Sequence, residues 1–197
     1  MRLPFVLSIP HCSSLVPEYI RPRVSLTDRE IKESEDLGTE EIFASLPASS
    51  VVVAEWSRVV VDLNRGRHEK GPKGVLPKMD YHGRSVYREG SYPGPEQTER
   101  LLSRYYVPFH QRLSKALSDT NLLGLIDCHS LSGTGPAGAP DPGKRRRDII
   151  LGNNGVPAGR VGRFGEEATC SPDVLKTLER AFARKGFSVA LNEPYAG

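Results

Sequence analysis

The amino-acid sequence predicts an α/β fold with a largely parallel sheet. Short apolar or β-branched runs alternate along the 197 residues with longer segments of helical character, and this alternation is typical of parallel sheets. Hydrophobic residues make up 38% of the chain and charged residues 26%, a balance that is typical of a globular domain with a sizeable core. We therefore expect one domain over residues 1–197.

Six segments have the composition of strands. They are rich in Val, Ile and Leu, and polar or turn residues follow most of them. The expected strands lie within residues 5–9, 51–54, 58–63, 122–130, 148–153 and 187–197.

Three segments have helical character, namely residues 26–46, 95–120 and 171–186. In the first, Thr27 and Glu30 have the spacing of a capping box, and Gly38 predicts a break or bend. Pro108 predicts a bend in the second helix. Ser171 is the expected N-cap of the third.

Two long segments, 66–94 and 131–147, are rich in Gly and Pro and are predicted to be loops. A loop of this length inside a compact domain is usually functional or flexible. We expect the two loops to form walls of a pocket.

The formal charge of +3 and the pI of about 8.8 are mild. They do not indicate nucleic-acid binding, but they are compatible with a small anionic substrate. The basic run 144–147 is short and has no interleaved aromatic residues, so we interpret it as a solvated loop. No apolar run is long enough to span a membrane. Three cysteines without a disulfide pattern favour a reducing cytoplasm, and we expect their thiols to be buried. The sequence is also compatible with a homo-oligomer.

Two expected strands each end on a histidine. An apolar run at the start of the chain leads to His11, and the run 122–127 leads to His129. Because the carboxyl ends of parallel strands form sites in α/β proteins, the two imidazoles could share a metal ion. A hydrogen-bonded loop histidine is the simpler explanation for either one alone.

A catalytic zinc site with two histidines needs a third ligand, commonly a carboxylate. The segment 33–41 offers five, and spacing does not select among them: Glu33, Glu35, Asp36, Glu40 and Glu41. A solvated acidic helix face would explain the same run. Asp127, two residues before His129, could orient a ligand from outside the metal shell.

The stretch SRVVVDLNR, residues 57–65, is predicted to be a strand that ends in Asn64 and Arg65. Arginine at a strand end can hold a carboxylate through two parallel hydrogen bonds, and asparagine adds a neutral donor. A surface salt bridge is the alternative role for Arg65.

Several motifs occur in an order that resembles the N-formylglutamate amidohydrolase family. These are SIPHCS, the DLGT stretch within the acidic segment, SRVVVDLNR, GVLPKMDYHGRSVY, YYVPFHQRL, DCHS and LNEPYAG. Each is weak alone, but together they cover nearly the whole chain.

The resemblance implies a zinc-dependent amidohydrolase with a three-layer fold like that of the zinc carboxypeptidases and phosphorylase/hydrolase-like proteins. In this fold a mixed, largely parallel sheet has helices on both faces. Carried over by position, the Zn²⁺ ligands are His11, Asp36 and His129. Glu40 and Glu35 are the alternatives to Asp36.

The resemblance also implies that Asn64 and Arg65 bind a substrate carboxylate, with Arg58 as a further residue for an anionic substrate. The implied substrate is an N-acyl acidic amino acid such as N-formyl-L-glutamate. A peptide or cell-wall amide as substrate, and a catalytically impaired protein that binds an acidic metabolite, are the alternatives.

The sequence departs from the family in three places. The turn after His11 lacks the family's glycine, and Tyr195 begins a changed C-terminal turn. The family's following strand, with a Leu-Glu pair, has no counterpart before Gly197. The general base is therefore unassigned, with Glu193 a weak candidate, and we expect a shortened or catalytically impaired family member.

Overall fold

The computed structural model describes residues 2–156 and 167–196. The chain divides into two compact units, Met1–Leu131 and Ser132–Gly197, and each is described by itself. That residues 1–197 form one domain stays a prediction.

A parallel three-stranded sheet forms the centre of the first unit. Its strands, in the order β2-β1-β3, are β2 (Ala48–Val53), β1 (Leu3–Ile9) and β3 (Gly124–Asp127). Both neighbours run parallel to β1, with Leu7 opposite Val51 on one side and Ile126 on the other. The predicted α/β class with parallel strands is therefore confirmed.

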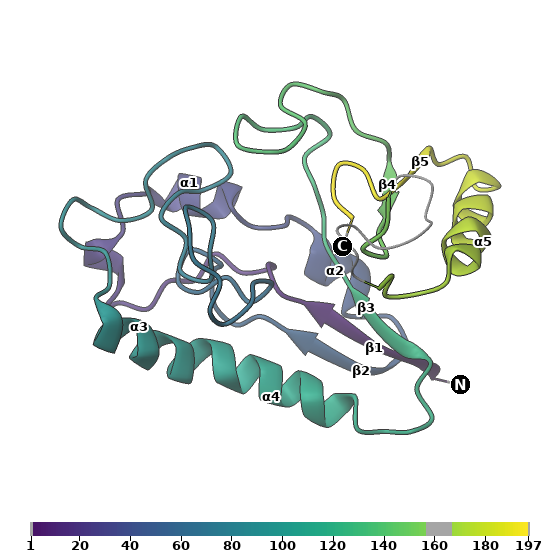
Figure 1. The fold of residues 1–197 in the computed structure, drawn as a ribbon, viewed down its shortest axis with the longest axis horizontal. Coiled ribbons are helices and arrows are strands. Elements are labelled where there is room, and N and C mark those ends of the chain that lie inside the picture. Colours follow the sequence, from purple (N-terminus) through teal and green to yellow (C-terminus); the bar gives the residue numbers. More distant parts are fainter. Residues whose placement is uncertain (1, 157–166, 197) are drawn as a thin grey trace. The chain divides into compact units, whose positions relative to one another are not determined.

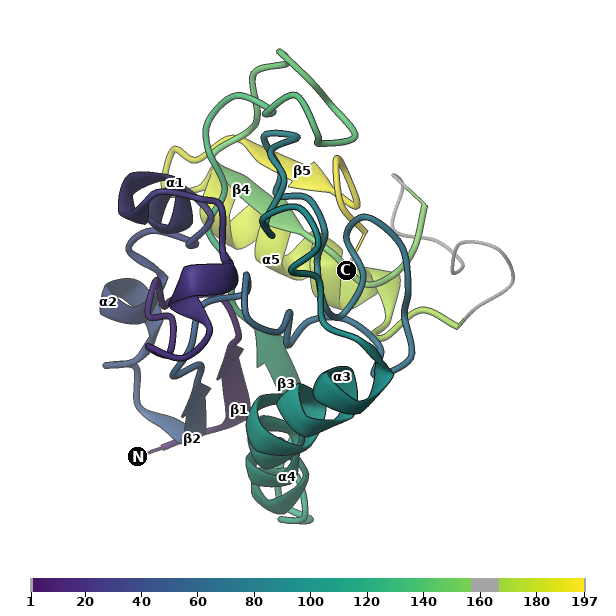
Figure 2. The same ribbon diagram turned by 90° about the vertical axis from the view of Figure 1, so that its left-hand side faces the viewer.

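The first unit also contains short helices. They are a 3-10 turn (Arg21–Arg23), α1 (Asp28–Glu33), α2 (Thr39–Phe43), α3 (Pro95–Leu101), a π-helical segment (Leu102–Tyr106) and α4 (Val107–Ala116). Helix α2 contacts β1, and α4 contacts β1 and β2. The two helices lie on opposite sides of this sheet (Figures 1 and 2).

The segment expected as one helix from 26 to 46 is two helices with a break between them. The capping box predicted at its start is present: the Glu30 N–H donates to the Thr27 hydroxyl, and the Glu30 carboxylate accepts from the Thr27 N–H. Gly38 has a φ of 76°, in the left-handed region that favours glycine. The predicted break at this glycine is confirmed.

Pro108 follows a π-helical turn, and the bend predicted there stays a prediction. The Val107 N–H donates to the carbonyl of Leu102, five residues earlier. The wider turn precedes the proline, whose ring would clash with the preceding turn of a regular α-helix. The helix ends at Ala116, short of the predicted 120.

The strand predicted at 58–63 is wrong. These residues form a turn and an irregular loop, in which the Val60 N–H donates to Ser57 and the Asp62 N–H donates to Val75. Val59, Val60 and Val61 are nonetheless almost completely buried. A buried valine run satisfies the hydrophobic effect in either conformation, so composition alone cannot tell them apart.

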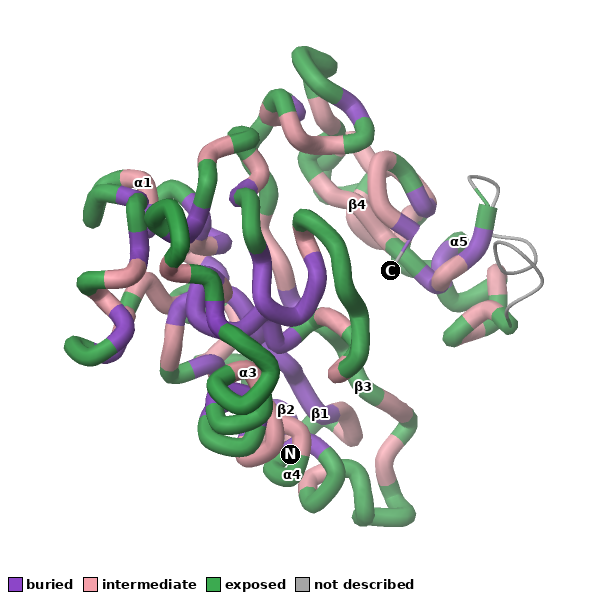
Figure 3. Tube along the Cα trace, turned by 60° about the vertical axis from the view of Figure 1, so that its left-hand side comes forward, coloured by how far each residue is buried: buried purple, intermediate pink, exposed green. Residues whose placement is uncertain are grey.

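The core of the first unit follows β1 and the loops after it. Figure 3 shows β1 buried over most of its length, whereas β3 is intermediate or exposed. The long loop 66–94 lies beyond the carboxyl ends of β1 and β2 (Figures 1 and 2).

In the second unit, β4 (Ile149–Leu151) pairs in parallel with β5 (Val189–Leu191), and α5 (Pro172–Ala183) contacts both. Ser171 caps α5 as predicted. The interpretation of 144–147 as solvated is wrong for Arg146. Its side chain is 4% exposed and makes two hydrogen bonds to the Asp141 carboxylate.

Candidate metal centre

Two imidazole nitrogens and one carboxylate oxygen converge at the carboxyl ends of β1 and β3. The Nδ1 atoms of His11 and His129 lie 3.3 Å apart. Asp36 Oδ2 lies 2.8 Å from Nδ1 of His129 and 3.7 Å from Nδ1 of His11. One ligand atom from each residue lies within 4.8 Å of the others, which is close enough to hold one metal ion.

The parallel sheet brings the two histidines together. His11 follows β1 after a single proline, and His129 follows β3 after one cysteine. Because β1 and β3 are neighbours and run in the same direction, their carboxyl ends share an edge of the sheet.

The break between α1 and α2 supplies the carboxylate. The Asp36 N–H donates to the carbonyl oxygen of His11 at 2.9 Å, and the Thr39 hydroxyl donates to the carbonyl oxygen of Asp36. The first bond attaches the break to the turn after β1, and the second holds the backbone of the break itself. The alternatives do not join this group: Glu35 pairs with Lys32, and Glu40 is exposed.

The outer nitrogen of each histidine faces another carboxylate. Asp62 Oδ1 lies 2.8 Å from Nε2 of His11, and Asp127 Oδ2 lies 2.8 Å from Nε2 of His129. If each Nε2 carries the proton, each Nδ1 presents its lone pair to the common point. Carboxylates behind metal-binding histidines fix ring orientation and increase ligand basicity in this way.

The charges around the group favour a cation. Burial opposes ionisation of Asp36, but the hydrogen bond with His129 and the nearby imidazole of His11 outweigh it and lower the pKa of the Asp36 carboxyl. Burial alone would lower the pKa of His129, whereas Asp127 and Asp36 together raise it to about 9. Two imidazoles with one ionised carboxylate form a donor set suited to zinc.

Comparisons with known proteins give the family. A sequence profile described as N-formylglutamate amidohydrolase matches residues 3–197. The chain belongs to the N-formylglutamate amidohydrolase family. The predicted amidohydrolase class is therefore confirmed, along with the recognised family.

Two curated relatives are similar over the full chain. The N-formylglutamate deformylase of Pseudomonas putida is 27% identical over 208 residues, which cover 100% of this chain and 72% of the relative. The enzyme of the same name from Pseudomonas aeruginosa is 28% identical over 207 residues, which cover 100% of this chain and 73% of the relative.

Two solved structures share the fold. One is an N-formylglutamate amidohydrolase from Ralstonia eutropha JMP134, with a TM-score of 0.70 and 20% identity over 100% of this chain and 74% of that one. The other is gene product Atu2144 from Agrobacterium tumefaciens, with a TM-score of 0.68 and 17% identity over 98% of this chain and 69% of that one.

The segment 57–65, one of the motifs that resemble the family, lies beside the candidate metal centre. The Arg58 guanidinium donates to Asp62 Oδ2 at 2.8 Å and lies 3.6 Å from Asp36 Oδ1. The Asn64 amide nitrogen lies 3.1 Å from Nε2 of His129. Arg65 donates to the Tyr81 hydroxyl at 3.1 Å.

Asp62 and Tyr81 were not predicted as site residues from the sequence. A usable signal existed for Asp62, because an aspartate directly after three valines is buried and needs a partner of opposite charge. Tyr81 lies in a loop without periodicity, and only the fold reveals its position. The predicted candidate Glu193 is exposed in the second unit, after β5.

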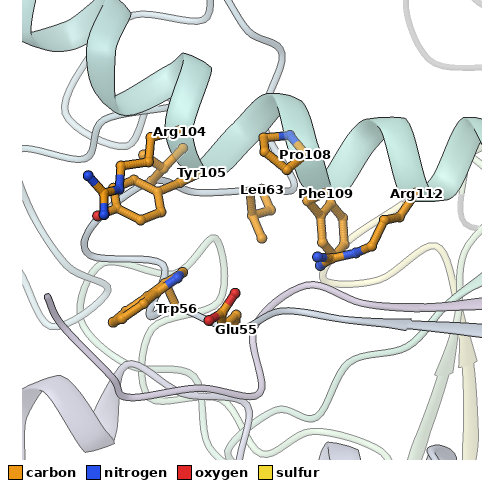
Figure 4. A pocket seen from close by; sticks show the side chains of 9 residues that line it. Glu55, Trp56, Leu63, Arg104, Tyr105, Pro108, Phe109 and Arg112 are labelled. Carbon is orange, nitrogen blue, oxygen red and sulfur yellow. The ribbon is translucent and has the colours of Figure 1, made fainter.

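A separate pocket contains none of the predicted site residues. It lies between the π-helical segment and α4 on one side and the segment 55–63 on the other (Figure 4). Aromatic and arginine side chains line it, including Trp56, Tyr105 and Arg104.

Among the described residues, no helix is long and apolar enough to cross a membrane.

Proposed function

We propose that this protein is a zinc-dependent hydrolase of the amide bond in an N-formyl acidic amino acid, with N-formyl-L-glutamate as the expected substrate. The observation that carries the proposal is the convergence of His11, Asp36 and His129 on one point in a member of this family. The names of the two curated Pseudomonas relatives support the choice of substrate.

His11, Asp36 and His129 would hold the zinc ion. When bound, zinc acts as a Lewis acid and lowers the pKa of a bound water, to about 7 in typical catalytic sites. Asp62 and Asp127 keep the two imidazoles in the required orientation through their outer nitrogens.

Arg65, with Asn64 beside it, would bind a carboxylate of the substrate. Guanidinium and carboxylate groups match in planar, two-bond geometry. Arg58 is held between Asp62 and Asp36, so its positive charge lies beside the ligand group. From there it would stabilise the oxyanion that develops on the amide carbonyl.

The general base is assigned from the sequence and not from contacts at the candidate centre. Within the first unit, the carboxylates of Asp36, Asp62 and Asp127 each contact a histidine of the candidate centre. Glu193, in the second unit, stays the candidate base from the sequence alone, as a prediction.

The test is turnover by the zinc-loaded, tag-free protein. Release of free amino acid is measured for N-formyl-L-glutamate, N-acetyl-L-glutamate and a short peptide amide. The proposal predicts that the formyl substrate is preferred. Preference for the peptide would indicate a zinc peptidase or amidase. Binding of the acidic compounds without turnover of any substrate would indicate a catalytically impaired binding protein.

A further inference from the structure

Two side chains from the π-helical segment and α4 hold the backbone on either side of Asn64. The Tyr106 hydroxyl donates to the carbonyl oxygen of Arg65 at 2.9 Å, and Nε2 of His110 lies 3.1 Å from the carbonyl oxygen of Leu63. Among the described residues, neither carbonyl accepts a bond from a backbone N–H. Because backbone carbonyl groups in a folded chain need donors, the helix supplies to this loop what a regular hydrogen-bond ladder would supply to a strand.

The rings of Tyr106 and His110 support each other. The two residues are one helical turn apart and lie on the same side of the helix. Their ring centroids are 4.0 Å apart, with the planes tilted by 32°, so each ring restricts the rotamers of the other. Tyr106 is also the last residue of the π-helical turn, a feature that occurs frequently at functional sites.

His110 donates through Nε2, because a carbonyl oxygen can only accept a hydrogen bond. Burial lowers the pKa of His110 and outweighs the Leu63 carbonyl and the charge of Asp127, which both act in the opposite direction. The imidazole is therefore neutral at neutral pH, with its single proton on the nitrogen that faces Leu63.

The two residues between these bonded carbonyl groups form the proposed carboxylate clamp, Asn64 and Arg65. The Asn64 N–H donates to Asp62 Oδ1 at 3.0 Å, and its amide nitrogen lies 3.1 Å from Nε2 of His129. The clamp lies in an irregular loop, where each residue keeps two free backbone dihedral angles unless a contact restricts them. The bonds from the helix provide this restriction at both ends of the clamp.

We infer that Tyr106 and His110 are positioning residues for the proposed carboxylate clamp. By holding the carbonyl groups of Leu63 and Arg65, they fix the backbone from which the side chains of Asn64 and Arg65 reach the substrate. They act through the clamp and have no proposed contact with the substrate. The inference rests on the proposed function for the role of the clamp, but the coupling of the helix to the loop is a separate property.

Removal of single donors tests the inference. Tyr106→Phe deletes the hydroxyl and keeps the stacked ring. Tyr105→Phe is its matched control, because the neighbouring hydroxyl in the same π-helical segment bonds to the hydroxyl of Tyr19 and not to the clamp. His110→Leu deletes the second donor, whereas His110→Gln keeps an amide N–H that can replace the one on Nε2.

Steady-state kinetics of the zinc-loaded proteins with N-formyl-L-glutamate measure the effect. Tyr106→Phe and His110→Leu should each raise the Michaelis constant by about three- to tenfold, the usual effect of one hydrogen bond, with kcat within about twofold of the wild type. Tyr105→Phe and His110→Gln should keep the Michaelis constant within about twofold of the wild type. The zinc content should be the same in all five proteins, because none of the substitutions removes a proposed ligand.

A purely structural role would lower the stability of Tyr106→Phe and leave its Michaelis constant unchanged, and this result would overturn the inference. An equal rise of the Michaelis constant in Tyr105→Phe would also overturn it. In an Arg65→Ala background, Tyr106→Phe should raise the Michaelis constant further by at most about twofold, because its effect passes through the clamp. Full additivity of the two substitutions would contradict this coupling.

Binding of glutarate, measured by calorimetry, separates the two proposals because it needs no turnover. If the wild type binds glutarate but hydrolyses no N-formyl substrate, the proposed function fails, and weaker binding by Tyr106→Phe but not by Tyr105→Phe supports the inference. If the wild type hydrolyses N-formyl-L-glutamate and Tyr106→Phe changes neither the Michaelis constant nor the Kd, the proposed function stands and the inference fails. A wild type that neither hydrolyses these substrates nor binds glutarate would overturn both.

Discussion

The Nε2 atom of His11 lies 2.8 Å from Oδ1 of Asp62, and both side chains are almost completely buried. This contact fixes which ring nitrogen of His11 faces Asp36 and His129. It also places Arg58 next to the group, because the second oxygen of Asp62 accepts a hydrogen bond from that guanidinium. One aspartate therefore orients a proposed metal ligand and holds a cation at the site.

Asp62→Asn should weaken zinc binding by about 10- to 100-fold, the usual effect of removing a carboxylate behind a ligating histidine. The amide keeps the shape of the side chain but cannot enforce the same histidine tautomer. Zinc affinity is measured by competition with a chelator of known affinity.

Asp80→Asn is the matched control for Asp62→Asn. Asp80 is also buried and pairs with an arginine, Arg84 at 2.6 Å, but it contacts neither histidine. Both variants should lose stability, whereas only Asp62→Asn should lose zinc affinity. Equal zinc affinity in the two variants would contradict the orienting role of Asp62.

Arg65→Ala should raise the Michaelis constant for N-formyl-L-glutamate by at least about tenfold, because a charged partner of the substrate is lost from a partly buried position. The measurement is steady-state kinetics with the zinc-loaded protein. Arg67→Ala is the control, since Arg67 pairs with Glu99 and has no proposed contact with the substrate. An unchanged Michaelis constant in Arg65→Ala would remove the proposed carboxylate clamp.

The metal-free protein should become less stable as the pH rises from about 6.5 to 9. The pKa of His129 is raised to about 9 in the folded chain by Asp127 and Asp36 after the opposing effect of burial. Protonated His129 therefore stabilises the fold fully below the unfolded pKa, and this contribution is lost as the pH passes through the folded pKa. The expected loss in the free energy of unfolding is at most roughly 3 kcal/mol.

Urea unfolding of chelator-treated protein measures this dependence between roughly pH 6 and 9.5, a range that includes the unfolded and the folded pKa of His129. His129→Ala should lose most of the slope, and His82→Ala should keep it because His82 is exposed. At lower pH a second loss is expected as the carboxyl of Asp36 becomes protonated, since its folded pKa is lowered. A slope shared by both histidine variants would assign the titration elsewhere.

Gly38→Ala should lower the free energy of unfolding by about 1 kcal/mol. No atom lies within 4 Å of the added methyl group, so the cost comes from the φ of 76° and not from a clash. Gly94→Ala is the control, because that position is equally open and has a φ of −71°. Thermal unfolding of both variants checks the difference, and equal midpoints would show that the break between α1 and α2 tolerates a side chain.

Strand-end histidines were predictable from sequence because parallel strands bring their carboxyl ends together. To predict His11 and His129 as site residues, it was enough to identify the apolar runs before them as strands. Asp36 was different, since five acidic residues occupy 33–41. Only the resemblance favoured Asp36, and the structure shows the physical reason in the bond between its N–H and the carbonyl of His11.

The segment 58–63 shows what sequence reasoning could not supply. Its valines are buried in an irregular loop, and the same composition in 51–53 belongs to β2. The difference arises from tertiary contacts, such as the bond between Asp62 and Val75, which are distant in sequence from the strand pattern. In a strand, Arg58 and Asp62 would share a face but lie roughly 13 Å apart. The turn brings their side chains to a hydrogen-bond distance of 2.8 Å.

The most direct test of the account is the metal content of the tag-free protein, measured by mass spectrometry for the wild type, His129→Ala and the control His82→Ala. We predict about one zinc per chain in the wild type and in His82→Ala, and its loss in His129→Ala. Absence of zinc from the wild type after incubation with the ion would contradict the claim that His11, Asp36 and His129 form a metal centre.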